Sequence, residues 1–240
     1  MAPPPPLPVW VKSTKWAPAT EGGGSAGFPV ECPATGDLGH GKPQYVWQEV
    51  LASLLADEIG VVVPKVRLGE HQGQVIAVSK LFGPKSLDIP ALKAASPKDY
   101  ASEALKKALR QASGALPFQA WVGNSDFKDA HVMVRGPKPK EFAVGCIDFA
   151  FSFQFDAAGE PAVAPQGPPV LIADEHREAE VIGQPVDRIE GLSDDRIREI
   201  VGGLPDAVFP TAEKDRVVKG LIARKSGLRA AFLHWITKPA

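Results

Sequence analysis

An aspartate inside an apolar run is the feature that most limits how this chain can fold. Asp148 lies between Ile147 and Phe149 in the sequence GCIDFAFSF, residues 145–153. A carboxylate embedded in a strand between two large apolar residues is costly unless the fold brings a partner to it. The chain is therefore expected to build a polar site against this strand.

A polar cluster precedes that strand in the stretch GNSDFKDAHVMV, residues 123–134. It holds Asp126, then Lys128 two residues later and His131 five residues later. In the kinase catalytic-loop pattern D-x-K-x-x-N, the acid orients or deprotonates the acceptor hydroxyl, and the lysine neutralises the transferred phosphoryl group. The residue at the fifth position shares a metal ion with an aspartate on a following strand, the position that Asp148 would fill. The two stretches together predict a site for Mg-ATP.

Composition and charge narrow the class of protein. The 240 residues are 44% hydrophobic with a formal net charge of -1, which fits one large globular domain or two small lobes. The near-neutral balance argues against a nucleic-acid or membrane-surface partner. The two cysteines form no CxxC pair, the N-terminus does not resemble a signal peptide, and no apolar run approaches about 20 residues. We therefore expect a cytoplasmic protein.

The N-terminal part alternates strand patterns with one helix. A glycine-rich segment, EGGGSAG at residues 21–27, could bring backbone amides to a phosphate or serve only as a flexible connection. An apolar stripe of period 3.6 predicts a helix from Pro43 to a cap at Gly60, with Glu49 on its flank. Strands are predicted at residues 8–13, 28–32, 61–68 and 74–81.

The remainder is mainly helical. After a connector at residues 82–90, helices are predicted over 97–113, 116–122, 187–192, 193–202 and 212–236, the last with a break near Gly227. A short strand pair at residues 132–135 and 142–147 interrupts them. This order predicts an α+β fold of two unequal lobes with a cleft between them.

Several stretches resemble the HipA-like kinases, which share the protein-kinase-like fold with the phosphatidylinositol kinases. The resemblance covers most of the chain from residue 43 to residue 232. It implies a two-lobed fold, with residues 1–82 forming a small β-rich N-lobe with one helix and residues 83–240 a larger, mainly helical C-lobe. The similar stretches are FQAWVGNSDFKDAHVMV with CIDFAFSF, QEVLASLLADEIGVVVP, LSDDRIREIVGGLP and LIARKSGLRAAF.

The resemblance also implies roles for individual residues. Asp126 would be the catalytic base, with Asn124 positioning it and Lys128 contacting the phosphoryl group. Asp148 would bind the metal, and Glu49 would pair with the lysine that contacts ATP. The connector that holds Ser79 and Leu81 would form the hinge against which adenine stacks.

Two positions depart from the family pattern. His131 stands where asparagine is usual, and imidazole suits Mn²⁺ better than Mg²⁺; Asp129 is the alternative metal ligand. Glu31 stands where the strand lysine is expected, so the ion pair with Glu49 is predicted to be broken. Lys12, Lys15 or Lys42 would then have to supply the charge, and Lys12 is taken as the cofactor-binding candidate.

Three functions remain open. The leading one is an ATP-dependent phosphotransferase, with Mg²⁺ or Mn²⁺, acting on a protein Ser or Thr hydroxyl. The second is a catalytically impaired pseudokinase that binds a nucleotide or a partner. The third is a metal-dependent hydrolase that uses Asp126, Asp129, His131 and Asp148.

Overall fold

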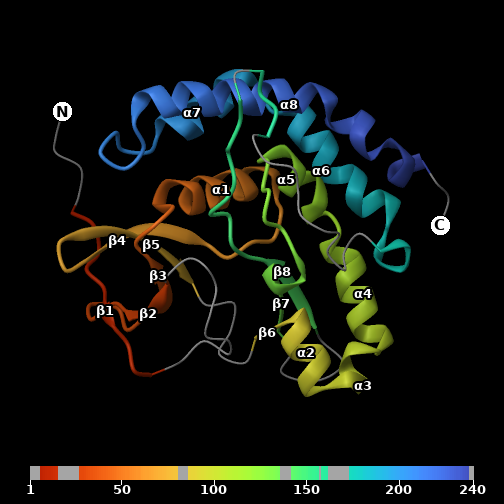
Figure 1. Cartoon of the computed structure of the whole chain (residues 1–240), viewed down its shortest axis with the longest axis horizontal. Coiled ribbons are helices and arrows are strands. Elements are labelled where there is room, and N and C mark those ends of the chain that lie inside the picture. The colour runs from red at the N-terminus through yellow and green to blue at the C-terminus, as the bar shows by residue number, and fades with distance from the viewer. Residues whose placement is uncertain are drawn as a thin grey trace.

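The computed structural model describes residues 6–15, 27–80, 86–135, 142–156, 158–161 and 173–237. A curled β-sheet and one helix form the N-terminal part, and helices with a second small sheet form the rest (Figure 1). The predicted α+β class with a β-rich N-terminal part and a mainly helical C-terminal part is confirmed. Within the described residues, no helix is long and apolar enough to cross a bilayer.

The N-terminal sheet closes on itself. Its antiparallel strands run in the order β1-β2-β3-β5-β4. The chain before β1 returns to β4, where Trp10 donates its backbone N–H to the carbonyl of Glu70 at 2.7 Å. The sheet is therefore curled into a small barrel rather than an open layer. The strands are β1 (Val11–Lys12), β2 (Phe28–Glu31), β3 (Leu38–Lys42), β4 (Val66–His71) and β5 (Gln74–Lys80).

Trp10 fills the interior of this barrel and is 2% exposed. Glycines face it because there is no room for larger residues: a Cβ at Gly69 would lie 2.6 Å from the Trp10 ring, and one at Gly39 would lie 2.7 Å from a methyl group of Val78. Side chains alternate across a strand, so β3 sends Gly39 and Gly41 inward and its other side chains to the opposite face. The sequence patterns did not predict β3, because LGHGK contains no alternating apolar residues.

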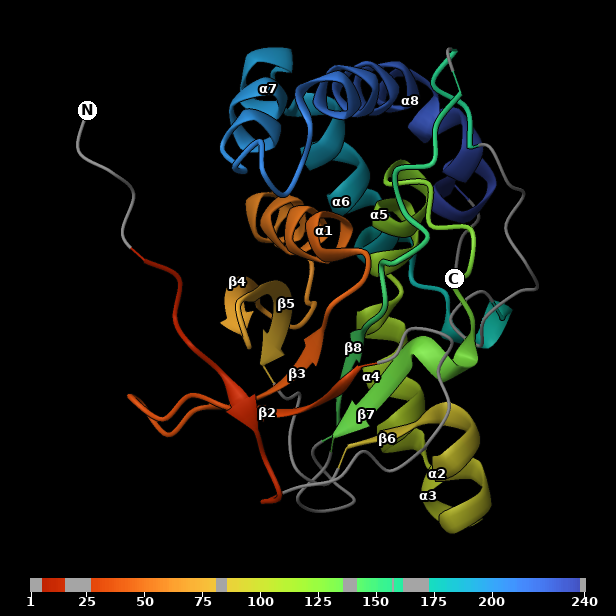
Figure 2. The same cartoon turned by 60° about the vertical axis from the view of Figure 1, so that its left-hand side comes forward.

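The helix α1 (Val46–Ile59) lies across β4 and β5 (Figure 2). It begins three residues later than predicted, because Tyr45 adopts a left-handed conformation with φ 55°. It ends at the predicted cap, Gly60, whose φ is 69°. The expected strand from residue 61 begins only at Val66, the first residue of β4.

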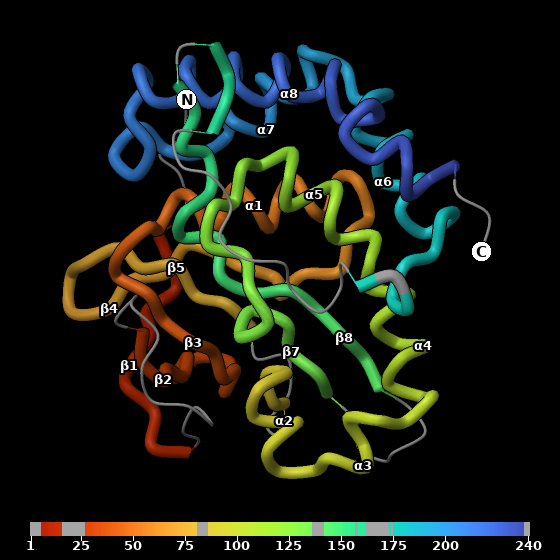
Figure 3. Tube along the Cα trace, turned by 45° about the vertical axis from the view of Figure 1, so that its right-hand side comes forward, coloured from red at the N-terminus to blue at the C-terminus, as the bar shows by residue number. Residues whose placement is uncertain are grey.

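The C-terminal part combines helices with a three-stranded sheet. Figure 3 traces the path from α5 into β7 and back through β8. The predicted strand pair is confirmed as β7 (Val132–Arg135) and β8 (Ala143–Cys146), and β6 (Leu87–Asp88) joins them. The helices are α2 (Ile89–Ala95), α3 (Pro97–Tyr100), α4 (Glu103–Ala112), α5 (Ala115–Trp121), α6 (Ala179–Gly191), α7 (Asp194–Gly202) and α8 (Thr211–Thr237), with 3₁₀ turns η1 (Asp129–His131) and η3 (Asp174–His176).

Three helix predictions were wrong in their bounds. The helix expected over 97–113 is divided into α3 and α4, because Ser102 caps the second one by accepting a hydrogen bond from the N–H of Leu105. The predicted break at Gly227 does not occur, and α8 runs through it. The piece expected at 187–192 is the end of the longer helix α6.

One large core unites α1 with the C-terminal helices. Trp47 of α1 stacks on Phe209 with ring centroids 4.1 Å apart and also contacts Phe153. At the other end of α1, Arg188 donates to the carbonyl of Ile59 at 2.9 Å, and Arg196 binds Glu58. The helix is thus fastened to the C-terminal part at both ends. The lobe boundary predicted at residue 82 falls in 81–85, outside the described residues, and stays a prediction.

Candidate active site

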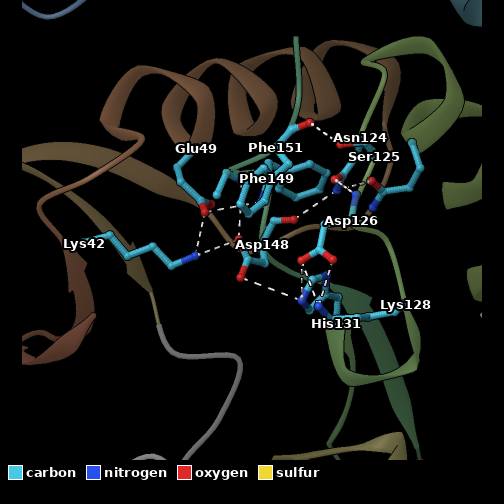
Figure 4. A network of polar contacts seen from close by, with 12 residues as sticks. Lys42, Glu49, Asn124, Ser125, Asp126, Lys128, His131, Asp148, Phe149 and Phe151 are labelled. Carbon is cyan, nitrogen blue, oxygen red and sulfur yellow. Dashed lines mark hydrogen bonds and ion pairs between the residues drawn. The ribbon is translucent and has the colours of Figure 1, made fainter. Parts of the chain in front are cut away.

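Lys42, at the end of β3, lies between two carboxylates (Figure 4). Its Nζ is 2.6 Å from Oε1 of Glu49 on α1 and 3.1 Å from Oδ1 of Asp148, two residues after β8. The exposed fractions of the three side chains are 13%, 5% and 19%. Two consecutive elements, β3 and α1, therefore meet the distant segment after β8 in one shielded ion-pair network.

The expectation of a broken ion pair at Glu49 was wrong. The strand lysine is Lys42, on the strand that the sequence patterns missed, and not a residue of 28–32. Glu31 instead accepts a hydrogen bond from Ser13 and pairs with Lys15. Lys12, the residue chosen from the sequence, lies exposed on β1 with its Nζ 5.7 Å from the centre of the Phe28 ring.

Burial and charge compete at these three groups. Burial alone lowers the pKa of Lys42, but the carboxylates of Glu49 and Asp148 outweigh it and raise that pKa, so the lysine stays an ammonium. Burial opposes ionisation of Asp148, yet the nearby Lys42 holds its pKa below the ordinary value. Burial raises the pKa of Glu49, and Lys42 opposes that rise. Glu49 and Asp148 therefore both depend on the ammonium of Lys42 for charge compensation.

The backbone at Asp148 adopts a left-handed conformation, with φ 66°. Such a conformation is costly for a residue other than glycine and persists only where its surroundings hold it. Asn124 donates its Nδ2 to the carbonyl of Asp148 at 3.0 Å, and Glu49 accepts the N–H of Phe149 at 3.3 Å. Asn124 also accepts the N–H of Asp126 at 3.2 Å, so it connects the two acids.

The loop after α5 carries the second group of polar residues. Lys128 binds both carboxylate oxygens of Asp126, at 2.8 and 2.9 Å. Nε2 of His131 is 3.8 Å from the nearest oxygen of Asp126 and 3.8 Å from that of Asp148. The loop and the network therefore face each other across His131. Asp129 begins η1 and is half-buried.

His131 is 7% exposed, and its Nδ1 is buried without a hydrogen-bond partner. Burial lowers the pKa of His131, with Asp148 opposing, so the ring is neutral at pH 7. A neutral imidazole can coordinate a divalent ion, beside the carboxylate of Asp148. Within the described residues no three His, Cys, Asp or Glu side chains form a complete metal cage.

The residues predicted to hold adenine are only partly described. Ser79 is in β5, opposite His40 of β3 on one side and Val66 of β4 on the other. Leu81 lies outside the described residues, as does the glycine-rich segment up to residue 26. A hollow of about 780 Å³ between α7 and α8 is lined by none of the predicted site residues.

Comparisons with known proteins agree with this architecture. No protein-family model and no curated protein matches the sequence. The solved structure of a Helicobacter pylori proinflammatory kinase, CtkA, matches with a TM-score of 0.66 and 14% identity, over 95% of this chain and 98% of that one. HipA, in a Shewanella oneidensis toxin–antitoxin complex with HipB and operator DNA, matches with a TM-score of 0.51 and 12% identity, over 82% of this chain and 59% of that one.

A third structure, WaaP in complex with acyl carrier protein, matches with a TM-score of 0.40 and 12% identity, over 95% of this chain and 85% of that one. Identities this low concern the fold alone. The chain shares the fold of the CtkA and HipA structures, as its resemblance to the HipA-like kinases implies.

Proposed function

We propose that this chain is an ATP-dependent phosphotransferase that transfers the γ-phosphoryl group to a Ser or Thr hydroxyl of a protein. The observation that carries the proposal is the Lys42 ammonium held between Glu49 and Asp148, with Asp126 on the facing loop. Two structures that share the fold are described as a kinase and as HipA. The protein acceptor is inferred from the resemblance of the motifs to HipA-like kinases.

The network around Lys42 would bind the nucleotide. Its ammonium is the cation available to the phosphates, and Glu49 fixes its position. Asp148 and His131, with Asp129 as the alternative, would hold Mg²⁺ or Mn²⁺. The ion would neutralise charge on the phosphates when bound. These residues position the nucleotide and do not themselves exchange protons with it.

The loop would carry out the transfer. The acceptor oxygen forms a bond to the γ-phosphorus, the bond between that phosphorus and the bridging oxygen breaks, and ADP leaves. Asp126 orients the hydroxyl and takes its proton. Lys128 already lies against Asp126, so its ammonium is placed to offset charge on the phosphoryl group as it passes.

The test is transfer of labelled phosphate from ATP to the protein itself and to a general Ser/Thr acceptor such as myelin basic protein. We expect labelling with Mg²⁺ or Mn²⁺ that falls at least 100-fold in Asp126→Asn. The change keeps the shape of the side chain, and a matching melting temperature shows that the fold is intact. Equal labelling by Asp126→Asn would overturn the assignment of the base.

A nucleotide-binding pseudokinase is the second candidate. His131 at the usual asparagine position, with a buried Nδ1 that lacks a partner, favours it, because a metal-binding histidine usually donates its second N–H. Stabilisation by ATP and metal without any phosphate transfer would select this candidate. No such observation favours the metal-dependent hydrolase, since the described His, Cys, Asp and Glu side chains include no group of three or more that could hold a metal ion.

A further inference from the structure

Gln119 is a buried polar residue to which the sequence motifs assign no role. It lies on α5, between the side chains of Phe118 and Trp121, both of which are fully buried. Its own side chain is 4% exposed. Burial of a side-chain amide is costly unless hydrogen bonds replace those that it makes with water, so Gln119 is expected to have a polar partner.

The partner is Asn124. Its Nδ2 donates to Oε1 of Gln119 at 2.9 Å, and its backbone N–H donates to the carbonyl of Gln119 at 3.0 Å. The same Nδ2 also donates to the carbonyl of Asp148, while Oδ1 accepts the N–H of Asp126 (Figure 4). Both protons and the oxygen of the Asn124 amide are therefore engaged.

The backbone decides how the two amides are oriented. A backbone carbonyl can only accept a hydrogen bond, and a backbone N–H can only donate one. The carbonyl of Asp148 and the N–H of Asp126 therefore fix which ends of the Asn124 amide are nitrogen and oxygen. The Gln119 atom that faces Nδ2 must then be its oxygen. While this oxygen keeps its place, a reversed Asn124 amide would set two oxygens against each other.

Stability alone does not account for a glutamine at this position. Its Nε2 is buried and makes no regular hydrogen bond to a described residue; the sulfur of Cys146 lies nearby, but sulfur is a weak acceptor. An apolar side chain of similar shape would avoid the cost of this poorly satisfied donor. What the glutamine adds is the acceptor for Asn124.

We propose that Gln119 is a positioning residue for phosphate transfer, which holds the Asn124 amide in the orientation that joins Asp126 to Asp148. The inference rests on the proposed function and adds to it a residue that touches neither the nucleotide nor the acceptor. Because α5 belongs to the main core, Gln119 connects the loop that carries Asp126 to a rigid part of the molecule.

Loss of this contact should affect transfer more than nucleotide binding. The carboxylate of Asp148 still has Lys42 at 3.1 Å when Asn124 is released. The loop has less support, since Asn124 holds the N–H of Asp126, and Lys128, which binds its carboxylate, belongs to the same loop. A displacement of about 1 Å in a reacting group can cost about 100-fold in rate.

The experiment measures phosphate transfer to myelin basic protein and Mg-ATP affinity in Gln119→Met, which keeps the length of the side chain but lacks the acceptor. We expect kcat to fall about 10- to 100-fold, while the affinity for Mg-ATP stays within about threefold of the wild type. Gln119→Glu keeps an acceptor oxygen and should transfer phosphate at least about fivefold faster than Gln119→Met. Melting temperatures show whether each variant is folded.

A double-mutant cycle tests whether Gln119 acts through Asn124. In an Asn124→Ala background, Gln119→Met should reduce transfer by less than about twofold, because the amide that Gln119 holds is already gone. Gln111→Met is the matched control, since Gln111 is an exposed glutamine on α4, and it should transfer phosphate like the wild type.

Unchanged transfer by Gln119→Met would overturn the inference, and so would equal transfer by Gln119→Met and Gln119→Glu. Losses from Gln119→Met and Asn124→Ala that multiply in the double variant would do the same. An equal fall in transfer and in Mg-ATP affinity would show a general structural role instead. If the wild type transfers no phosphate, the proposed function fails as well, whereas equal transfer by the wild type and Gln119→Met removes only the inference.

Discussion

The two halves of the candidate site differ in how firmly they are held. The half around Lys42 is shielded, with contacts of 2.6 and 3.1 Å to two carboxylates, and α1 fixes one of these from within the main core. In the half around Asp126, Lys128 is 50% exposed, and the contacts of His131 with both acids are 3.8 Å long. We therefore expect the half around Lys42 to be preassembled for nucleotide binding, and the half around Asp126 to rearrange during phosphate transfer.

The largest effect on stability is expected from Lys42→Met. Removing the cation leaves Glu49 and Asp148 facing each other without compensation, and breaking a buried pair in this way typically costs about 3–5 kcal/mol. Urea unfolding would measure the loss. Lys65→Met is the matched control, because its pair with Asp57 is largely exposed and should contribute less than about 1 kcal/mol. Similar losses in the two variants would contradict a preassembled first half.

Acid should destabilise the protein, partly through His40. Its pKa is about 4 in the folded protein and ordinarily 6.5, so between these values the unfolded chain binds the proton more readily. The free energy of unfolding should therefore fall as the pH decreases from 6.5 to 4, with His40 contributing about 1–3 kcal/mol. His131 and His176 also have lowered pKa values and act in the same direction.

The variant His40→Gln isolates the contribution of His40. Its free energy of unfolding, measured by urea at pH 7 and pH 4.5, should fall less than that of the wild type. The same pH dependence in both proteins would show that the ring is not shielded as the structure has it.

His131→Asn should change the choice of metal. Replacing imidazole by an amide oxygen removes a ligand that suits Mn²⁺ and supplies one that suits Mg²⁺. The ratio of Mn²⁺ to Mg²⁺ affinity in the presence of ATP should fall about tenfold. The Mn²⁺ affinity can be followed by the paramagnetic resonance of the free ion, which needs no catalysis. An unchanged ratio would leave Asp129 as the remaining candidate ligand.

Lys128→Ala should have the smallest effect on stability, below about 1 kcal/mol, because the lysine is half-exposed and its pair with Asp126 is local. Phosphate transfer should nevertheless fall at least tenfold, while the affinity for ATP changes little. If Lys128→Ala lost as much stability as Lys42→Met, the proposed difference between the two halves of the site would be wrong.

The sequence predicted the second half of the site better than the first. The loop from Asn124 to His131 is continuous, so its spacing could be read directly, and Asp148 stood out against its apolar neighbours. Lys42 was one of three candidate lysines and could not be selected from the sequence, because its strand has glycines where apolar residues normally indicate a strand. Those glycines are explained by side chains of neighbouring strands that fill the barrel, Val78 against Gly39 and Val30 with Ile76 against Gly41. Such a tertiary cause leaves no local pattern.

The helix boundaries failed for similar reasons. The start of α1 depends on the left-handed Tyr45, whose ring lies 5.4 Å from that of Phe151, a contact between distant segments. By contrast, the end of α1 at Gly60 and the strands β7 and β8 follow local rules and were predicted closely. The role of Glu49 depends on a local pattern and on a tertiary contact. Its position on the flank of α1 is visible in the helix pattern, but its ion pair with Lys42 is not.

The most direct test of the account compares Asp126→Asn and Asp148→Asn in paired measurements of Mg-ATP affinity and phosphate transfer. The account predicts that Asp126→Asn binds Mg-ATP within about twofold of the wild type while its transfer falls at least 100-fold. Asp148→Asn should lose both, since it belongs to the binding half. Wild-type Mg-ATP affinity in Asp148→Asn, or undiminished transfer in Asp126→Asn, would contradict the division of the site into these two halves.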